Sequence, residues 1–311
     1  MLDFSPITLE QKPLFDKYFR QQRFDNSHFN FTTRFIWRQP YDLRWALIDG
    51  CLCFRGSQHG KYFILPPISP DRQAVGAALD KLTADFAASG WPLVIRDLER
   101  PLAEELAALR PDSLSFRKDR DNYDYVYAVE DLSELKGRAY HGKKNHANTF
   151  RRLYPDYRFV PLTADLARAC LGLEASWAAG RDPDDENLLA EKQALNETIV
   201  NYDALGLTGA VILVGDRTVA FTIGEQLNDD TAVVHFEKAD ASYKGIYAVI
   251  NQEYCATYWR HLKYVNRQED LGIDGLRQAK KSYHPVKMIE KCVAAGCRSV
   301  SRKATAATCC R

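Results

Sequence analysis

The chain has 311 residues, a length that suits one large domain or two of ordinary size. Its content of 46% hydrophobic and 12% aromatic residues is that of a folded protein and excludes a disordered one. The formal net charge of +1 gives no general attraction to nucleic acid, so such binding must rest on local patches. No apolar run approaches the ~20 residues that span a bilayer, and no signal peptide is recognisable. We expect a cytoplasmic protein, for which peripheral contact with a membrane stays open.

The first half of the chain alternates helices and strands. Residues 71–89 give the clearest signal, because Val75, Leu79, Leu82 and Phe86 recur at the spacings of an amphipathic helix. The predicted helices are 9–20, 71–89 and 102–109, and the predicted strands are 43–54, 61–66, 91–97 and 123–129.

A basic segment, residues 136–155, follows and contains six Lys or Arg residues and no acid. On a helix, Lys144, Asn148 and Arg152 share one face. A charge run is usually only a solvated face, but the Asn and His residues mixed into this one favour a surface that binds phosphate. Both interpretations stay open from the residues alone. The apolar side chains that we expect to be buried are Tyr140, Ala147, Phe150 and Leu153.

The second half has helices, then an antiparallel meander, then another helix and further strands. The predicted helices are 164–179, 186–204, 246–259 and 276–282, and the predicted strands are 208–214, 218–225, 231–237, 264–266 and 286–292. This order predicts an α+β layer fold. The predicted division is a domain at 1–135, a basic connecting helix at 136–155, a domain at 156–294, and a disordered tail at 295–311.

The chain contains eight cysteines. The first four fall in predicted strands and helices, as free thiols in a reducing compartment do. The last four do not have the paired spacing of a zinc site. We therefore predict no metal site and no tightly bound cofactor. The last four are Cys292, Cys297, Cys309 and Cys310.

Residues 266–285, NRQEDLGIDGLRQAKKSYHP, run from acidic to basic. Glu269 and Asp270 precede two glycines, and Arg277 and Lys280 follow within a short helix. Cations so close together repel unless an anion or a carboxylate lies among them. We expect Arg277 to pair with the carboxylates and Lys280 to stay available for the phosphate of a donor molecule.

Four segments together resemble a known family. Their order and residues resemble the DUF2156 family, which is grouped with the C-terminal domain of phosphatidylglycerol lysyltransferases and is related to FemXAB-like proteins. The resemblance covers roughly residues 3–294 and implies two tandem domains of the acyl-CoA N-acyltransferase (GNAT) type. The segments are RAYHGKKNHANTF (138–150), LGLTGAVILVGDRTVAFTIGE (205–225), HFEKAD (235–240) and NRQEDLGIDGLRQAKKSYHP (266–285).

The resemblance implies transfer of an aminoacyl group from aminoacyl-tRNA to a lipid headgroup or to a small amine or hydroxyl compound. In the lysyltransferases, a basic helix near the end of the domain closes on a K-x-[KS]-[FY]-x-P-like pattern. Lys280, Ser282, Tyr283 and Pro285 stand in those places, with Arg277 one turn earlier. This match implies that Arg277, Lys280 and Tyr283 contact the donor.

The loop 242–247 bears on the identity of the donor. Acetyltransferases that use coenzyme A carry a [QR]-x-x-G-x-[GA] loop, whose N–H groups hold the pyrophosphate. Here only Gly245 is kept, and Tyr247 replaces a small residue, which disfavours coenzyme A, although Lys244 can still contact a phosphate. Two alternatives stay open: an acyltransferase that uses acyl-CoA or acyl carrier protein, and a non-catalytic binding module with the same fold.

The strand predicted at 231–237 supplies candidates for a general base. His235 and Glu237 alternate along it, so we expect both side chains on one face of the sheet. In the acetyltransferase fold this strand borders the acyl group. The catalytic candidates are therefore His235, Glu237 and Asp270. The alternative is a core histidine that hydrogen-bonds the glutamate.

Overall fold

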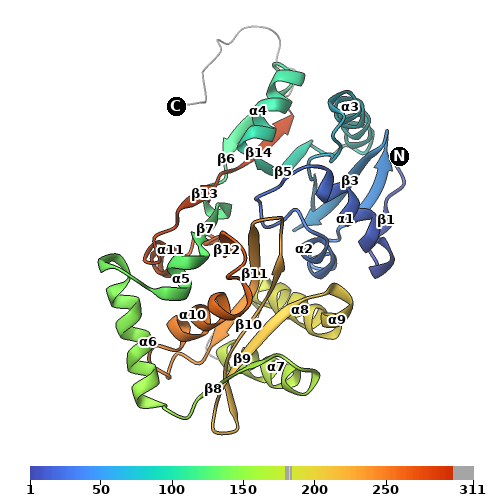
Figure 1. Cartoon of the computed structure of the whole chain (residues 1–311). Coiled ribbons are helices and arrows are strands. Elements are labelled where there is room, and N and C mark those ends of the chain that lie inside the picture. Colours follow the sequence, from blue (N-terminus) through green and yellow to red (C-terminus); the bar gives the residue numbers. More distant parts are fainter. Residues whose placement is uncertain (179–181, 183, 297–311) are drawn as a thin grey trace. The chain divides into compact units, whose positions relative to one another are not determined.

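The computed structural model describes residues 1–178, 182 and 184–296. Contacts divide the chain into unit 1, Met1–Tyr123 with Glu290–Arg311, and unit 2, Asp124–Ile289. Each unit contains a seven-stranded mixed sheet flanked by helices, so the predicted α+β class is confirmed (Figure 1). Among the helices of the described residues, none is long and apolar enough to cross a membrane.

The units divide the chain differently from the predicted domains. The first boundary lies at residue 123 and not at 135, because the strand that begins at Asp124 pairs with strands of unit 2. The last strand returns to the sheet of unit 1, where it lies between two earlier strands and includes residues 295 and 296 of the predicted tail. The rest of that tail, 297–311, lies outside the described residues.

Unit 1 is built on a sheet with the strand order β1-β2-β3-β4-β5-β14-β6. Its elements are β1 (Ser5–Pro6), η1 (Leu9–Gln11), α1 (Lys12–Gln21), α2 (Phe31–Ile36), β2 (Arg44–Ile48), β3 (Cys51–Gln58), β4 (Lys61–Ile64), α3 (Arg72–Ala88), β5 (Val94–Glu99), α4 (Arg100–Leu109), β6 (Leu114–Lys118), η2 (Arg120–Asn122) and β14 (Lys291–Gly296). The predicted helix at 71–89 is α3, and its N-cap Asp71 accepts hydrogen bonds from two backbone N–H groups of the first turn.

The segment 43–54 is a β-hairpin and not the single strand that we predicted. β2 and β3 pair antiparallel up to Ile48 and Cys51, and Asp49 and Gly50 form the turn between them. Both turn residues have positive φ, 50° and 77°, which is the combination that favours Asp-Gly in a tight hairpin. The continuous apolar pattern concealed this two-residue turn.

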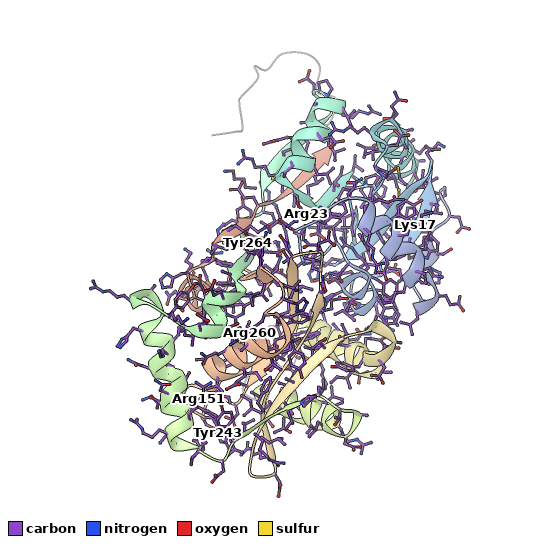
Figure 2. The ribbon with its side chains drawn as sticks, viewed as in Figure 1. Lys17, Arg23, Arg151, Tyr243, Arg260 and Tyr264 are labelled. Carbon is purple, nitrogen blue, oxygen red and sulfur yellow. The ribbon has the colours of Figure 1, made fainter. Side chains whose placement is uncertain are left out.

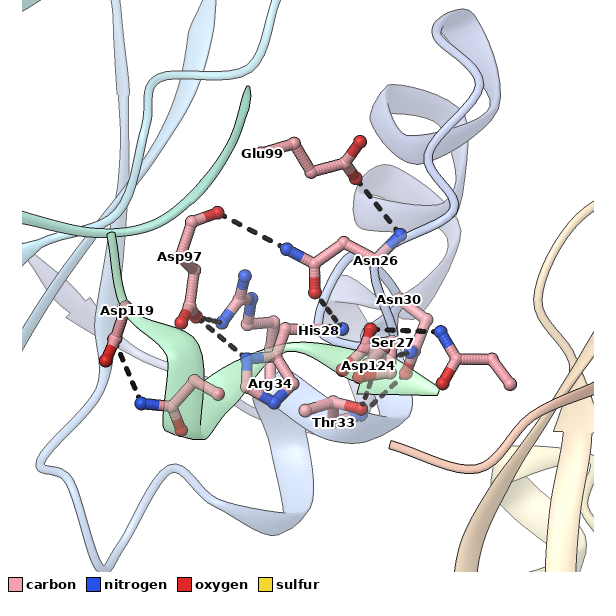
Figure 3. Close-up of polar contacts among 12 residues, drawn as sticks. Asn26, Ser27, His28, Asn30, Thr33, Arg34, Asp97, Glu99, Asp119 and Asp124 are labelled. Carbon is pink, nitrogen blue, oxygen red and sulfur yellow. Dashed lines mark hydrogen bonds and ion pairs between the residues drawn. The ribbon is translucent and has the colours of Figure 1, made fainter. Parts of the chain in front are cut away.

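A largely buried polar cluster surrounds Asp97, near the end of β5 (Figure 3). Its carboxylate lies 3.3 Å from Nη1 of Arg34 and 3.1 Å from Nδ1 of His28. Burial by itself would raise the pKa of the Asp97 carboxyl, but the charges of His28, Arg34 and Lys291 outweigh it and hold that pKa well below its usual value of 3.8. The stability of unit 1 therefore depends on Asp97 being ionised.

We predict that this aspartate makes unit 1 sensitive to acid. The unfolded chain takes up a proton near pH 3.8 while folded Asp97 stays ionised, so the stability that Asp97 contributes is present above that pH and is lost as pH falls below it. Asp97→Asn should lower the free energy of unfolding by about 3 kcal/mol or more at pH 7, because Arg34 stays buried without its carboxylate. Denaturant unfolding at several pH values measures both effects.

The comparison between the two proteins decides this prediction. As pH falls below about 4, the free energy of unfolding should decrease less steeply for Asp97→Asn than for the wild type. Equal pH slopes for the two proteins would contradict the role of Asp97, whatever the stability at neutral pH.

Unit 2 is built on a sheet with the strand order β13-β7-β12-β11-β10-β9-β8. Its elements are β7 (Asp124–Ala128), α5 (Val129–Glu134), η3 (Arg138–Tyr140), α6 (His141–Leu153), β8 (Arg158–Pro161), α7 (Ala164–Ala178), α8 (Glu186–Val200), α9 (Tyr202–Leu205), β9 (Thr208–Val214), β10 (Arg217–Gln226), β11 (Thr231–Ala239), α10 (Ile246–Tyr258), β12 (Tyr264–Asn266), α11 (Asp274–Lys281) and β13 (Lys287–Ile289). The meander of β9, β10 and β11 lies within a residue or two of its predicted bounds.

Helices cover both faces of this sheet. Neighbouring residues of a strand point to opposite faces, and here Glu237 contacts Asn251 of α10, whereas Lys238 contacts Glu174 of α7 and Glu191 of α8. The sheet is thus a layer between α10 on one side and α7 and α8 on the other.

The basic segment forms α6, which packs against α10 (Figure 1). Tyr140, Ala147 and Phe150 are buried as expected, but Leu153 is 51% exposed. Leu153 is the last residue of α6, where the helix leaves the core. Arg151, which Figure 2 labels on α6, pairs with Glu253 of α10 at 2.7 Å. One face of the helix is therefore fixed to the core and the other is left to solvent.

Candidate active site

Unit 2 has a polar centre where two parallel strands separate. β11 and β12 are paired only over Thr231–Val233 and Tyr264–Asn266, and beyond that point β11 continues without β12, paired with β10 on its other side. Glu237 lies on this continuation, and Arg267 is the first residue after β12. Their side chains meet at 2.7 Å and are only 10% and 12% exposed.

Arg267 is held as a buried cation. Burial opposes its charge, but Glu237 and the neighbouring tyrosines favour that charge more strongly and raise the pKa of Arg267. Its guanidinium carbon lies 5.6 Å from the ring centre of Tyr127 and 4.9 Å from that of Tyr283. The ion pair is thus enclosed by aromatic rings, which strengthens it by keeping water away.

Polar side chains from β10 and α10 border this pair. Thr222 is the cross-strand partner of Glu237, and Asn251 donates to Glu237 Oε2 at 3.3 Å. Within the described residues, Thr222 Oγ1, Asn251 Oδ1 and Arg267 Nη1 are buried and have no hydrogen-bond partner. Buried polar atoms normally have partners, so this centre is suited to hold water or the polar groups of a ligand.

A pocket of ≈ 200 Å³ adjoins the polar centre at Tyr283. Lys143 of α6 lies in its wall, with Nζ 3.9 Å from the ring centre of Tyr283. Burial, and then the charge of Arg267, lower the pKa of Lys143. Because the Tyr283 ring contacts both Lys143 and Arg267, it connects the pocket with the polar centre. The other lining residues are His146, Ala241, Tyr243, Gly245, Ile246, Tyr247 and Ala248.

Gly245, the N-cap of α10, is required by helix packing. Its φ is +91°, and a Cβ at this position would lie 2.1 Å from the backbone oxygen of His146. Gly245 is the one residue kept from the coenzyme A loop, and the structure places the backbone of α6 against it. A carbonyl oxygen at this point repels a pyrophosphate, which disfavours the binding mode of coenzyme A.

The predicted phosphate ligands of α6 face solvent. Lys144, Asn148 and Arg152 are exposed on one face, as their spacing predicted. Lys144 also lines a surface hollow of ≈ 660 Å³ at the start of α6, together with Arg138 and His141. Lys244 is exposed in the loop before α10, next to Tyr243, which Figure 2 labels. These cations form a surface and not a buried site.

His235 does not share a face with Glu237, which corrects the prediction. The register between β10 and β11 shifts at Ile223 and Gly224, so His235 is an extra residue in β11 and the alternation is interrupted. His235 Nε2 lies 2.9 Å from Glu225 on β10, and its side chain is 1% exposed. The structure therefore brings Glu237 into the polar centre and leaves His235 outside it.

The carboxylate of Asp270 is occupied by structural contacts. It is fully buried, and Arg277 donates to both of its oxygens at 3.0 and 2.8 Å. Tyr125 Oη donates to Oδ2 at 2.5 Å, and the N–H of Gly272 donates to Oδ1 at 2.9 Å. The predicted pairing of Arg277 with a carboxylate is thus observed. With both oxygens engaged, Asp270 holds the loop and does not offer a base to a substrate.

Lys280 holds the same loop, contrary to the expectation that it waits for a donor. Its ammonium group donates to the backbone oxygens of Arg267, Gln268 and Glu269 at 2.5, 3.0 and 2.6 Å. Burial lowers its pKa to about 8, against the opposing effect of Glu269, so Lys280 is still charged at neutral pH. In the acidic-to-basic stretch, the lysine of the helix thus binds the backbone of the loop that precedes it.

The profile of a family described as "Phosphatidylglycerol lysyltransferase, C-terminal" matches residues 19–295. The chain belongs to this family. The resemblance seen in the four motifs is thereby confirmed, together with the acyltransferase class that the family name denotes. An uncharacterised protein of Mycoplasmoides gallisepticum is 22% identical over 172 residues, which are 54% of each chain. The chain thus spans about half the length of this curated relative.

Solved structures show how widely the family fold is shared. A conserved protein of unknown function from Bacteroides thetaiotaomicron is 36% identical, with a TM-score of 0.89 over 95% of this chain and 100% of that one. The L-PGS structure from Bacillus licheniformis is 14% identical, with a TM-score of 0.66 over 95% and 93%. FemX is 11% identical, with a TM-score of 0.61 over 94% and 97%. The last two show similarity of fold.

The sequence did not single out several residues of this family member's centre. Arg267 stands inside a quoted motif but looks like one more cation, and Lys143 is adjacent to the chosen Lys144. Asn251 and Thr222 lie in apolar elements without any pattern that marks them. The available signal was a polar residue within a buried stretch, as at Asn251 in α10 and Thr222 in β10.

Gly245→Ala should destabilise the protein far more than Gly215→Ala. Both glycines have positive φ, +91° and +58°, which costs an alanine about 1–2 kcal/mol. Only at Gly245 does the added Cβ collide with backbone, whereas nothing lies within 4 Å of a Cβ at Gly215. Thermal unfolding of the two variants isolates the collision, and equal melting temperatures would contradict the packing of α6 on α10.

Lys280→Met should lower the free energy of unfolding by about 3 kcal/mol, because three carbonyl oxygens lose a charged donor. Lys281→Met is the matched control, since Lys281 is exposed at the end of the same helix, and we expect it to stay within ~0.5 kcal/mol of the wild type. Urea unfolding measures both. A Lys280 variant as stable as its control would restore Lys280 as a free ligand for the donor.

Proposed function

We propose that this protein is an aminoacyltransferase that draws its aminoacyl group from aminoacyl-tRNA. The observation that carries the proposal is the contact of α6 with Gly245. This contact fills the place at the start of α10 where a pyrophosphate would bind. The opposite, basic face of α6 is exposed to solvent. A polyanion can be gripped from outside by Lys144, Asn148 and Arg152. Such a donor occurs in the cytoplasm, where we propose that the protein acts.

The reacting end of the donor enters the pocket beside Lys143. The nucleophile is an amine or hydroxyl group of the acceptor, which attacks the ester carbonyl of the aminoacyl group. A new amide or ester bond forms, the bond to the ribose oxygen breaks, and the proton of the acceptor passes to that oxygen. Lys143 stabilises the developing oxyanion from the pocket wall, and its lowered pKa suits it to hand a proton to the leaving oxygen.

The polar centre behind the pocket has a positioning role. Glu237 neutralises Arg267, and the ring of Tyr283 then holds Lys143 at a fixed distance from them. The acceptor is a lipid headgroup or a small amine or hydroxyl compound, and the pocket volume of ≈ 200 Å³ sets the size of the group that reacts.

The test is a transfer assay with radiolabelled aminoacyl-tRNAs, offered with vesicles that contain phosphatidylglycerol and, in parallel, with soluble amines. We expect label to leave the tRNA only in the presence of one acceptor class. Lys143→Met should lower kcat about 100-fold with a smaller change in KM. The double variant Lys144→Met and Arg152→Met should instead raise KM and weaken the salt dependence of binding.

For the proposal to hold, Lys143→Met must act mainly on kcat and the double variant mainly on KM. Transfer from acetyl-CoA without any need for tRNA would replace it by the thioester mechanism. Tight tRNA binding without transfer to either acceptor class would favour a non-catalytic binding module.

A further inference from the structure

The guanidinium of Arg34 in unit 1 has one engaged nitrogen and one unpartnered edge. Arg34 is 3% exposed, and its Nη1 donates to Asp97 Oδ2 at 3.3 Å (Figure 3). Nε and Nη2 are also buried, and neither has a hydrogen-bond partner within the described residues. These two nitrogens form the side-on edge of the guanidinium, which binds carboxylates through two parallel hydrogen bonds.

Aromatic rings do not replace the missing partners. The guanidinium carbon lies 5.4 Å from the ring centre of Phe29 and 5.5 Å from that of Phe54. Cation–π contacts act through the faces of the rings and attract the charge as a whole. They accept no in-plane hydrogen bond from Nε or Nη2, so two charged donors stay unsatisfied in a site shielded from water.

The position of this edge in the fold is that of a ligand site. β4 and β5 are parallel strands that pair only at Ile64 and Ile95, and Asp97 lies two residues further along β5. Asp97 has a φ of 59°, a left-handed conformation that is uncommon for a residue other than glycine. Strained backbone of this kind concentrates at sites that clamp ligands. Here it fixes the carboxylate that orients Arg34.

We propose that unit 1 has a binding site for a small oxyanion, with a carboxylate as the best fit, on the Nε–Nη2 edge of Arg34. The planar edge matches the two oxygens of a carboxylate, and a phosphate can present two oxygens in the same way. Asp97 occupies Nη1 and holds the guanidinium in place. The site lies in the other unit from the pocket at Lys143 and does not depend on the proposed aminoacyl transfer.

The test uses the wild-type protein with ¹⁵N-labelled arginine. The Nε–H resonance of Arg34 is assigned by its loss in Arg34→Lys, and sodium acetate, sodium phosphate and sodium chloride are titrated at constant ionic strength. Acetate is used because a closed site admits only a small anion. We expect a saturable shift with acetate, and a weaker one or none with phosphate.

Two variants complete the test by calorimetric titration of acetate. Arg34→Lys should weaken binding about tenfold or more, because a lysine cannot form the paired hydrogen bonds. Arg96→Lys is the matched control, since Arg96 precedes Asp97 on β5 and, like Arg34, lies over a ring, that of Phe63. It should bind acetate as the wild type does. If Arg34→Lys does not fold, a high-resolution crystal structure of the wild type grown with acetate decides whether the anion lies on the edge of Arg34.

Two results would overturn the proposal. One is a shift that does not saturate, or one that chloride reproduces, since both indicate general ionic effects. The other is a high-resolution crystal structure, grown with acetate, that shows only a water molecule on the edge of Arg34. A phosphate response stronger than the acetate response keeps the oxyanion site and changes its preferred ligand.

Discussion

The ion pair between Glu237 and Arg267 is the interaction on which the functional side of unit 2 depends. Parallel strands that separate leave space inside a sheet, and here a charged pair fills that space where apolar packing would close it. Removing one partner would leave the other charge buried, at a cost of about 3–5 kcal/mol. Arg267 also contacts the ring of Tyr283, and the same ring contacts Lys143. The position of Lys143 in the pocket wall therefore depends on the ion pair.

The two units use the same arrangement at corresponding places. In unit 1 the strands β4 and β5 separate, and Asp97 meets Arg34 between two phenylalanine rings. In unit 2 the strands β11 and β12 separate, and Glu237 meets Arg267 beside two tyrosine rings. The difference lies in the arginine. In unit 2 one of the rings beside the arginine, that of Tyr283, also borders a pocket, and one nitrogen of Arg267 has no hydrogen-bond partner among the described residues. In unit 1 two nitrogens of Arg34, which form one edge of its guanidinium, have none.

Periodicity in the sequence predicted most elements of the fold and failed at particular residues. The strand 208–214 was located correctly because Gly206 precedes it and the turn Gly215-Asp216 follows it. The strand 264–266 was also located correctly. His235 was placed on the wrong face because a β-bulge adds one residue without changing the apolar pattern. For Lys280 the reason is different. Its partners are backbone oxygens, which every residue possesses, so no spacing of side chains could have indicated that this lysine is structural.

This distinction between satisfied and solvent-facing cations supports the choice of α6 as the grip for the donor. On α11, Arg277 is bound to a buried carboxylate and Lys280 to three carbonyl oxygens, so an incoming phosphate would have to displace strong contacts. On α6, Lys144 and Arg152 face solvent, and a phosphate displaces only water and counterions. The helix α11, which the sequence matched to the basic helix of the lysyltransferases, holds the loop together. The helix α6, for which the sequence left open both a solvated face and a surface that binds phosphate, presents its charge to solvent.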